Sequence, residues 1–163
     1  MLFFSHLVLG IIAGIIIAFI VNDNKVIIYT AAGSVFPDLI DKPLGYLLLS
    51  ESIGSGRIFF HGFWLMFFLL IAGIVIFIKI KNPLLLALSL GITVHQLADN
   101  MWNSPVSWFW PIFGPYAPGN ASPDYFFKLI LKEFSTISEI FSLCINAIFL
   151  GVYFLWKKYY VQK

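Results

Sequence analysis

The chain has 163 residues, of which 60% are hydrophobic and only 11% are charged, and its formal net charge is +2. Soluble domains carry a charge on about 25% of their residues, so this composition excludes an ordinary soluble domain. The small net charge, with no cluster of basic residues beyond the pair 157–158, also argues against a nucleic-acid partner. We therefore expect one all-α domain, residues 1–163, folded as a polytopic membrane helix bundle.

Five apolar segments approach the length of about 17–25 residues that a membrane-spanning helix needs. The first lacks a basic leader and a convincing cleavage site, so we expect a retained span and not a signal peptide. The second contains Pro37 and Pro43, which should break or kink its helix between them. The predicted spans are approximately residues 2–21, 26–49, 58–78, 83–101 and 138–156.

Between the fourth and fifth spans the composition changes to Pro, Gly and aromatic residues with little charge, over residues 102–124. Trp and Tyr favour the membrane–water interface, which predicts an ordered interfacial loop. The three tryptophans of this loop are expected to anchor it and not to bind a cofactor: Trp102, Trp108 and Trp110. An amphipathic helix over residues 125–138 should follow.

The distribution of basic residues predicts the orientation of the spans. With five crossings, six Lys/Arg residues lie on the side of the C-terminus and four on the side of the N-terminus. Because cytoplasmic segments carry the excess of Lys and Arg, we expect a cytoplasmic C-terminus and an N-terminus outside.

All three histidines and three acidic residues fall at one predicted depth. A helical rise of about 1.5 Å per residue places them roughly 18–27 Å from the opposite ends of their segments, in the outer half of the bundle. They come from four separate segments: His6, Asp38 with Asp41, His61, and His95 with Asp99. This convergence is the strongest physical indication in the sequence of a functional site.

A charged side chain at the bilayer centre costs about 2.5–3.5 kcal/mol on insertion scales, so such residues usually face an interior site. His95 and Asp99 share one helix face at i, i+4 and could chelate a divalent cation such as Zn²⁺. Taken singly, this pair could be an interhelical hydrogen bond, and Asp38 and Asp41 could be solvated caps. Their shared depth favours a site that binds metal or handles protons. Three other acids lack such support and are expected to be solvated: Glu51, Glu133 and Glu139.

Four motifs resemble those of a known family: His6 near the N-terminus, "SVFPDLIDKPLG", "GRIFFHGFW" and "HQLADNMWNSPVSWFWPIFG". In this order they are similar to the membrane-bound, metal-dependent hydrolases of the YdjM type, a family also described as LexA-binding and inner-membrane-associated. The resemblance covers residues 1–114. It implies a multi-pass protein of the inner (cytoplasmic) membrane with its site on the extracytoplasmic side. The acidic motif here is Asp38-x-x-Asp41 and not the tighter D-x-D, which leaves open which carboxylate is the main ligand.

The order of the motifs is also distantly similar to the zinc-dependent phospholipase C superfamily. The H-x-x-x-E-type ligands of that group are missing, so one or two ions, most plausibly zinc, are expected and not three. The resemblance implies a phosphoester hydrolase acting on a lipid or lipid-linked phosphate. In that reading His61, His95, Asp99 and one of Asp38 and Asp41 hold the principal metal.

In the same reading His6 and the other acid hold a second ion or orient the attacking water, and Asp38 or Asp41 acts as the base. Arg57 would bind the substrate phosphate through its planar guanidinium group, or would simply be an interfacial charge. Residues 102–116 would form a wall or lid.

Two other functions remain open from the sequence. A transporter or ion-handling module could use the same layer of His and Asp, although the spans below it are almost purely apolar. A scaffold with a structural metal is the third possibility. The oligomeric state is not encoded in any pattern of the sequence.

Overall fold

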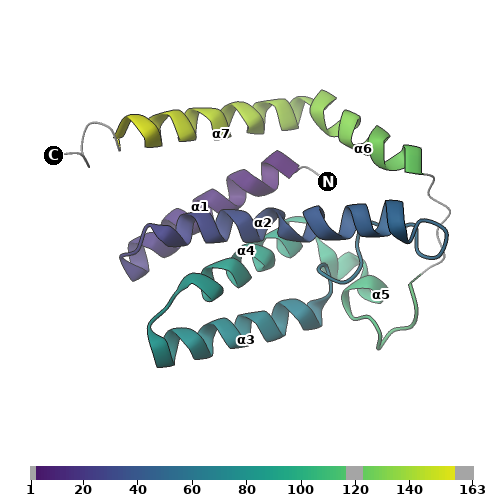
Figure 1. Ribbon diagram of the computed structural model, residues 1–163, viewed down its shortest axis with the longest axis horizontal. Helices are drawn as coiled ribbons and strands as arrows, with labels where there is room; N and C mark the ends of the chain where they lie inside the picture. Colours follow the sequence, from purple (N-terminus) through teal and green to yellow (C-terminus); the bar gives the residue numbers. More distant parts are fainter. Residues whose placement is uncertain (1–2, 117–122, 157–163) are drawn as a thin grey trace.

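The computed structural model describes residues 3–116 and 123–156, which are all-helical with no strand among them. Four helices form the body of the bundle: α1 (Phe3–Val21), α2 (Lys25–Pro43), α3 (Phe63–Ile80) and α4 (Leu84–Ala98). A fifth long helix, α7 (Ile137–Trp156), lies along α1 (Figure 1). The short elements are η1 (Leu44–Leu48), η2 (Met101–Asn103) and α5 (Pro105–Trp108), and an amphipathic helix, α6 (Pro123–Ser135), precedes α7. The predicted all-α class and amphipathic helix are confirmed.

The expected five spans are confirmed only in part. By length and composition, α1 and α3 can cross a membrane, and α6 with α7 would make a third span if the bent pair counts as one. Helix α4 has 15 residues and is about 22 Å long, shorter than the apolar core of about 30 Å. Helix α2 is 19 residues long but contains two acids and two lysines.

The expected break of helix α2 between Pro37 and Pro43 is absent. The helix continues through Pro37 and ends at Pro43, and the chain then stays helical as the π-helix η1. In η1 the Leu49 amide donates to the Leu44 carbonyl oxygen at 2.8 Å. A proline removes one backbone donor from the ladder, and the wider π-turn follows directly after Pro43. Asp38 and Asp41 therefore keep helical spacing and differ in direction.

Small residues at intervals of four allow the helices to approach closely. The buried face of α1 consists of His6, Gly10, Gly14 and Ala18. Where α2 crosses α4, a Cβ atom at Gly33 would overlap the Leu88 carbonyl oxygen, and one at Gly91 would overlap the Thr30 carbonyl oxygen. Such close contacts are typical of helix pairs in membranes. The buried faces of α1, α2 and α4 each also carry residues of the predicted polar layer, which are His6, Asp38 with Asp41, and His95.

The outward faces of the helices are apolar. Phe19 is 91% exposed on α1, and Ile20, Ile78 and Ile80 are also exposed on α1 and α3. A surface of this kind is expected where the surrounding solvent is lipid and not water.

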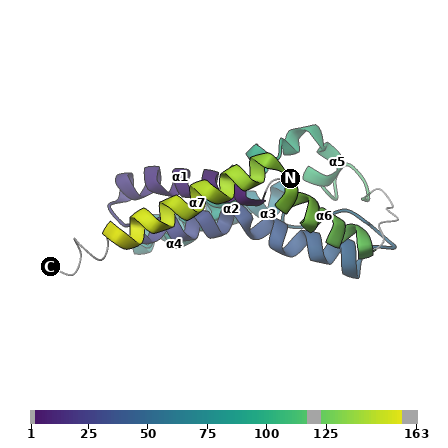
Figure 2. The ribbon, with the colours of Figure 1, turned by 90° about the horizontal axis from the view of Figure 1, so that it is seen from above.

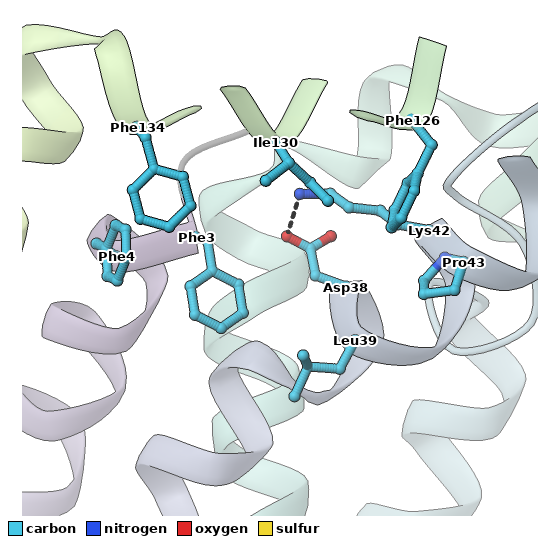
Figure 3. A pocket seen from close by; sticks show the side chains of 9 residues that line it. All are labelled: Phe3, Phe4, Asp38, Leu39, Lys42, Pro43, Phe126, Ile130 and Phe134. Carbon is cyan, nitrogen blue, oxygen red and sulfur yellow. Dashed lines mark ion pairs between the residues drawn. The ribbon is translucent and has the colours of Figure 1, made fainter. Parts of the chain in front are cut away.

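Helices α6 and α7 form a bent pair beside the first turn of α1. The two helices meet at an angle of 65°, and in Figure 2 their junction lies next to the N-terminal end of α1. An apolar groove of about 220 Å³ lies between α6, the start of α1 and the C-terminal part of α2 (Figure 3). Helix α6 thus covers the end of the bundle at which the polar layer lies.

The α2–α4 contact predicts the effect of adding one methyl group. Gly91→Ala should lower the free energy of unfolding by about 1–3 kcal/mol, because the Thr30 backbone must move to admit the new Cβ. Gly151→Ala is the matched control, since a Cβ there has no atom within 4 Å. The two variants can be compared by thermal unfolding in detergent, and equal stabilities would contradict the packing described.

Candidate metal centre

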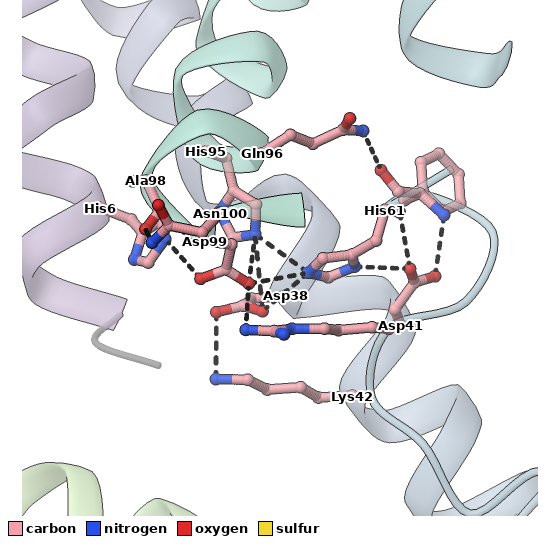
Figure 4. Close-up of polar contacts among 12 residues, drawn as sticks. His6, Asp38, Asp41, Lys42, His61, His95, Gln96, Ala98, Asp99 and Asn100 are labelled. Atoms are coloured by element: carbon pink, nitrogen blue, oxygen red, sulfur yellow. Dashed lines mark hydrogen bonds and ion pairs between the residues drawn. The ribbon is translucent and has the colours of Figure 1, made fainter. Parts of the chain in front are cut away.

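The structure brings the six predicted His and Asp residues together at one end of the bundle (Figure 4). Helix α1 supplies His6 near its start, and the last turns of α2 supply the two aspartates. The turn before α3 supplies His61, and α4 supplies His95 with Asp99 just after its end. All six side chains are buried. The common depth predicted from the sequence therefore corresponds to a real cluster.

The two central histidines face each other through the same ring atom. His61 Nδ1 donates to the Asp41 carboxylate at 2.8 Å, and His95 Nδ1 donates to the Ser34 carbonyl oxygen at 2.6 Å. These acceptors fix the tautomers, so a neutral ring carries an unprotonated Nε2 in each case. The two Nε2 atoms lie 3.0 Å apart. Two lone pairs at this distance repel each other, so either a proton on one of the rings, which makes the contact an N–H···N hydrogen bond, or a metal cation lies between them.

Two carboxylates complete a set of ligands around these nitrogens. Asp38 Oδ1 lies 3.5 Å from His61 Nε2 and 3.8 Å from His95 Nε2. Asp99 Oδ2 lies 3.7 Å from His61 Nε2 and 4.0 Å from His95 Nε2. Nitrogens bound to one tetrahedral Zn²⁺ at about 2.0–2.1 Å are about 3.3 Å apart, which is close to these separations. The two groups that could hold an ion are Asp38, His61 and His95, and His6, His95 and Asp99.

Asp38 Oδ1 is also a buried oxygen that accepts no hydrogen bond from any residue the structure describes. A buried carboxylate oxygen in this position costs free energy unless a cation or a donor satisfies it. The residues present therefore fit a divalent metal ion by both geometry and chemistry.

Asp41 lies behind His61 and not beside Asp38. Its carboxylate accepts hydrogen bonds from the backbone amides of Ile58, Phe60 and His61 at 3.0–3.1 Å, besides the one from the imidazole. It belongs to neither group that could hold a metal. A carboxylate behind a ligating histidine fixes its tautomer and makes it a stronger ligand. Of the two acids that the sequence could not rank, Asp38 is the one that faces the centre.

The charges of the cluster do not balance. Lys42 Nζ lies 3.0 Å from Asp38 Oδ2, and Arg57 Nη2 lies 3.1 Å from Asp99 Oδ2. With Asp41 there are three buried carboxylates against two cations, which leaves one negative charge when the histidines are neutral. A bound cation would reverse this imbalance.

Arg57 is the least buried of these groups, with a side chain 33% exposed. It lines a polar pocket of about 330 Å³ together with Ser5, His6, Asp99 and Asn100. The guanidinium group is thus placed at an opening of the cluster, where a molecule from outside could reach it.

A polar stripe on α7 holds the start of α1, and the sequence analysis missed it. Glu139 was expected to be solvated, and this is wrong, because its side chain is fully buried. It accepts the backbone amides of Phe4 at 2.7 Å and Ser5 at 3.2 Å, and the Ser5 hydroxyl at 2.6 Å. A carboxylate at a helix N-terminus satisfies amides that have no partner within the helix and interacts favourably with the helix dipole.

Two more residues of α7 continue this stripe at helical spacing. Ser142 Oγ lies 2.9 Å from Ser5 Oγ, and Asn146 donates to the Phe4 carbonyl oxygen at 3.1 Å. Spacings of three and four residues place them on the same face as Glu139. His6 directly follows the residues that this face holds, and its Nε2 lies 3.1 Å from Asp99 Oδ1. Helix α7 therefore positions one member of the cluster. Glu51 is exposed as expected, and the side chain of Glu133 lies outside the described residues.

Gln96 is a second residue that the sequence did not single out. Its amide donates to the carbonyl oxygens of Phe60 at 3.2 Å and Gly62 at 3.3 Å, on either side of His61. Its oxygen accepts the Trp108 indole N–H at 2.7 Å. The predicted aromatic loop thus buttresses the His61 turn through one of its tryptophans. The sequence around Gln96 could not reveal that it supports His61, because its hydrogen bonds reach a turn 34 residues earlier in the chain.

The same loop closes the site behind Asp41. The Tyr116 ring stacks on Trp110 with centroids 5.3 Å apart. Burial, and after it the Asp41 carboxylate, raise the pKa of the Tyr116 phenol, which therefore stays protonated. Residues 117–122 of the predicted loop lie outside the described part of the chain.

The family described as YdjM inner membrane protein matches residues 1–162 of this chain. Comparisons with curated proteins and with solved structures gave no match.

The α7 stripe predicts a specific loss of stability. Glu139→Ala should lower the free energy of unfolding by about 1–3 kcal/mol, because the Phe4 and Ser5 amides would remain buried without an acceptor. Amide hydrogen exchange at Phe4 and Ser5 should accelerate in parallel. Glu51→Ala removes an exposed carboxylate and is the matched control. If both variants unfold alike and protect Phe4 equally, Glu139 does not hold α1.

Proposed function

This chain belongs to the YdjM inner membrane protein family, and we propose that it is a membrane-embedded, metal-dependent hydrolase that cleaves a phosphoester of a lipid or lipid-linked substrate. The observation that carries the proposal is the pair of Nε2 atoms of His61 and His95 that face each other at 3.0 Å with Asp38 Oδ1 beside them. Zinc is the metal that suits two imidazoles and one or two carboxylates best. One ion is favoured, because His95 belongs to both possible groups.

The residues divide into ligands and supports. His61, His95 and Asp38 would hold the ion, with Asp99 as the fourth ligand. Asp41 would orient His61, in line with its four hydrogen bonds. His6, next to Asp99, would fix the direction of that carboxylate.

A bound divalent ion would lower the pKa of a water molecule toward about 7 and would polarise the phosphoryl oxygen. Of the two predicted bases, Asp38 is favoured by its position, because it faces the histidine pair, whereas Asp41 lies behind His61 and accepts hydrogen bonds at both oxygens. Arg57 would bind the substrate phosphate with its forked donors from the polar pocket. Lys42 and Arg57 then offer positive charge from two sides of the cluster.

The alternative of a conducting pathway receives less support. Beyond the cluster the hydroxyls of Ser34 and Ser89 bond to carbonyl oxygens of their own helices. At the far end, the interior is closed by an apolar core around Ala18, Val26 and Ala87. These features favour a pocket that opens on one side only. We propose that the pocket opens on the extracytoplasmic side and that the C-terminus is cytoplasmic. The excess of Lys and Arg at the end of the bundle that carries the C-terminus supports this orientation.

The proposal predicts that phosphoester hydrolysis depends on both metal and Asp99. Protein stripped with a chelator should be inactive on phospholipids and isoprenyl phosphates, and added Zn²⁺ should restore turnover. Asp99→Asn should lower turnover by about 10–100-fold, in line with the effect of disturbing the surroundings of a metal, while its unfolding temperature stays close to that of the wild type.

Glu51→Gln changes an exposed carboxylate in the neighbouring loop and should keep full activity. Turnover that survives chelation, or an Asp99→Asn variant as active as the control, would contradict a metal-dependent hydrolase. Protein that binds zinc but hydrolyses none of these esters would favour the structural-metal alternative.

A further inference from the structure

The groove under α6 reaches the candidate metal centre directly. Seven of its nine lining residues are apolar, and the other two are Asp38 and Lys42. In Figure 3 the side chains of Phe3, Ile130, Phe134 and Phe126 surround the Lys42–Asp38 pair. A single cavity therefore joins an apolar wall to a carboxylate of the cluster and to the cation beside it.

We propose that this groove binds one fatty acyl chain of an anionic membrane lipid, with the lipid phosphate held against Lys42. The inference deepens the proposed function, on which its choice of substrate class rests. The described lining of this groove comes from α1, α2 and α6, whereas the described residues of the aromatic loop, predicted as a wall or lid, do not contribute to it.

The size of the groove argues for one chain and not for a whole lipid. Its volume of about 220 Å³ is below the range of about 300–1,000 Å³ that accommodates a complete drug-sized ligand. The remainder of the lipid would stay in the bilayer. Leu39 on the groove wall is 54% exposed, and Phe127 and Leu131 on the outer side of α6 are 59% and 69% exposed. The groove is therefore continuous with an apolar outer surface from which a chain can enter.

The charge at the inner end argues for an anionic headgroup. Lys42 lies 3.0 Å from Asp38 and has a side chain only 12% exposed, so its ammonium group lies at the base of the groove. Once Asp38 Oδ1 takes part in holding a cation, the surroundings of Lys42 become more positive. Charge-assisted contacts between Lys42 and a lipid phosphate are then strong. A zwitterionic headgroup should bind more weakly, because it also carries a cation of its own.

The apolar groove and the pocket that contains Arg57 lie on different sides of the cluster. Helix α6 lies on the side of Asp38, and the polar pocket with Arg57 lies on the side of Asp99. A phosphoester whose chain lies under α6 would thus extend its polar part toward Arg57. The apolar and the polar portions of the substrate would meet at the histidine pair.

Photolabelling of the full-length protein in vesicles tests the groove without requiring turnover. The probe is phosphatidic acid with a diazirine in its acyl chain, diluted in phosphatidylcholine, and the comparison is phosphatidylcholine carrying the same diazirine. Label from phosphatidic acid should concentrate on Leu39 and Ile130. Lys42→Met should lower it about tenfold, the effect of losing one hydrogen bond to a charged group, while Lys128→Met on exposed α6 should not.

A second pair of variants tests the groove wall. Ile130→Trp should fill the groove and remove most of the label from Leu39, whereas Leu131→Trp, on the 69% exposed position next to it, should leave the label unchanged. Equal labelling by the two lipids, label spread evenly to Leu131, or no effect of Ile130→Trp would overturn the proposal.

Hydrolysis of a water-soluble phosphoester separates this proposal from the proposed function. If that ester is cleaved but the lipid labels no groove residue, the hydrolase stands and the acyl groove is rejected. If the groove is labelled as expected but no phosphoester is cleaved, the lipid site stands and the hydrolase is rejected.

Discussion

The two Nε2 atoms that face each other across 3.0 Å impose the constraint on which the rest of the site depends. Each imidazole gives its only proton to an oxygen behind it, on Asp41 or on the Ser34 backbone. When both rings are neutral, they present lone pairs to one another inside a buried cluster whose net charge is negative. A cation relieves this repulsion and also satisfies the unpaired oxygen of Asp38. One bound metal ion would thus satisfy the histidine pair and Asp38 together.

The close approach of the helices makes this arrangement possible. The Ser34 carbonyl oxygen reaches His95 because Gly33 and Gly91 leave no side chain between α2 and α4. On α1 the small residues Gly10 and Gly14 continue the face that carries His6. From the other side α7 fixes the first turn of α1 through Glu139. The geometry of the site therefore depends on the packing of the bundle, since a change in helix spacing would move the His and Asp side chains.

Much of this could be predicted from residues alone. The apolar composition indicated a helical membrane protein, and counting helical rise brought three histidines and their acids to one level. The ranking of Asp38 and Asp41 could not be predicted, because it depends on where the turn at Ile58–His61 offers its amides. The burial of Glu139 was missed for a similar reason, since its partners lie about 135 residues away. The five spans predicted from composition are confirmed only in part, because α4 is apolar but has only 15 residues.

X-ray absorption spectroscopy of the zinc-loaded protein tests the central claim most directly. The ligand set described predicts nitrogen and oxygen neighbours at about 2.0–2.1 Å with the outer-shell scattering of two imidazole rings, and one fewer ring in His95→Ala. A sulfur neighbour at about 2.3 Å would assign the metal to Cys144, the only cysteine of the chain. That result, or a spectrum unchanged in His95→Ala, would contradict a metal centre at the histidine pair.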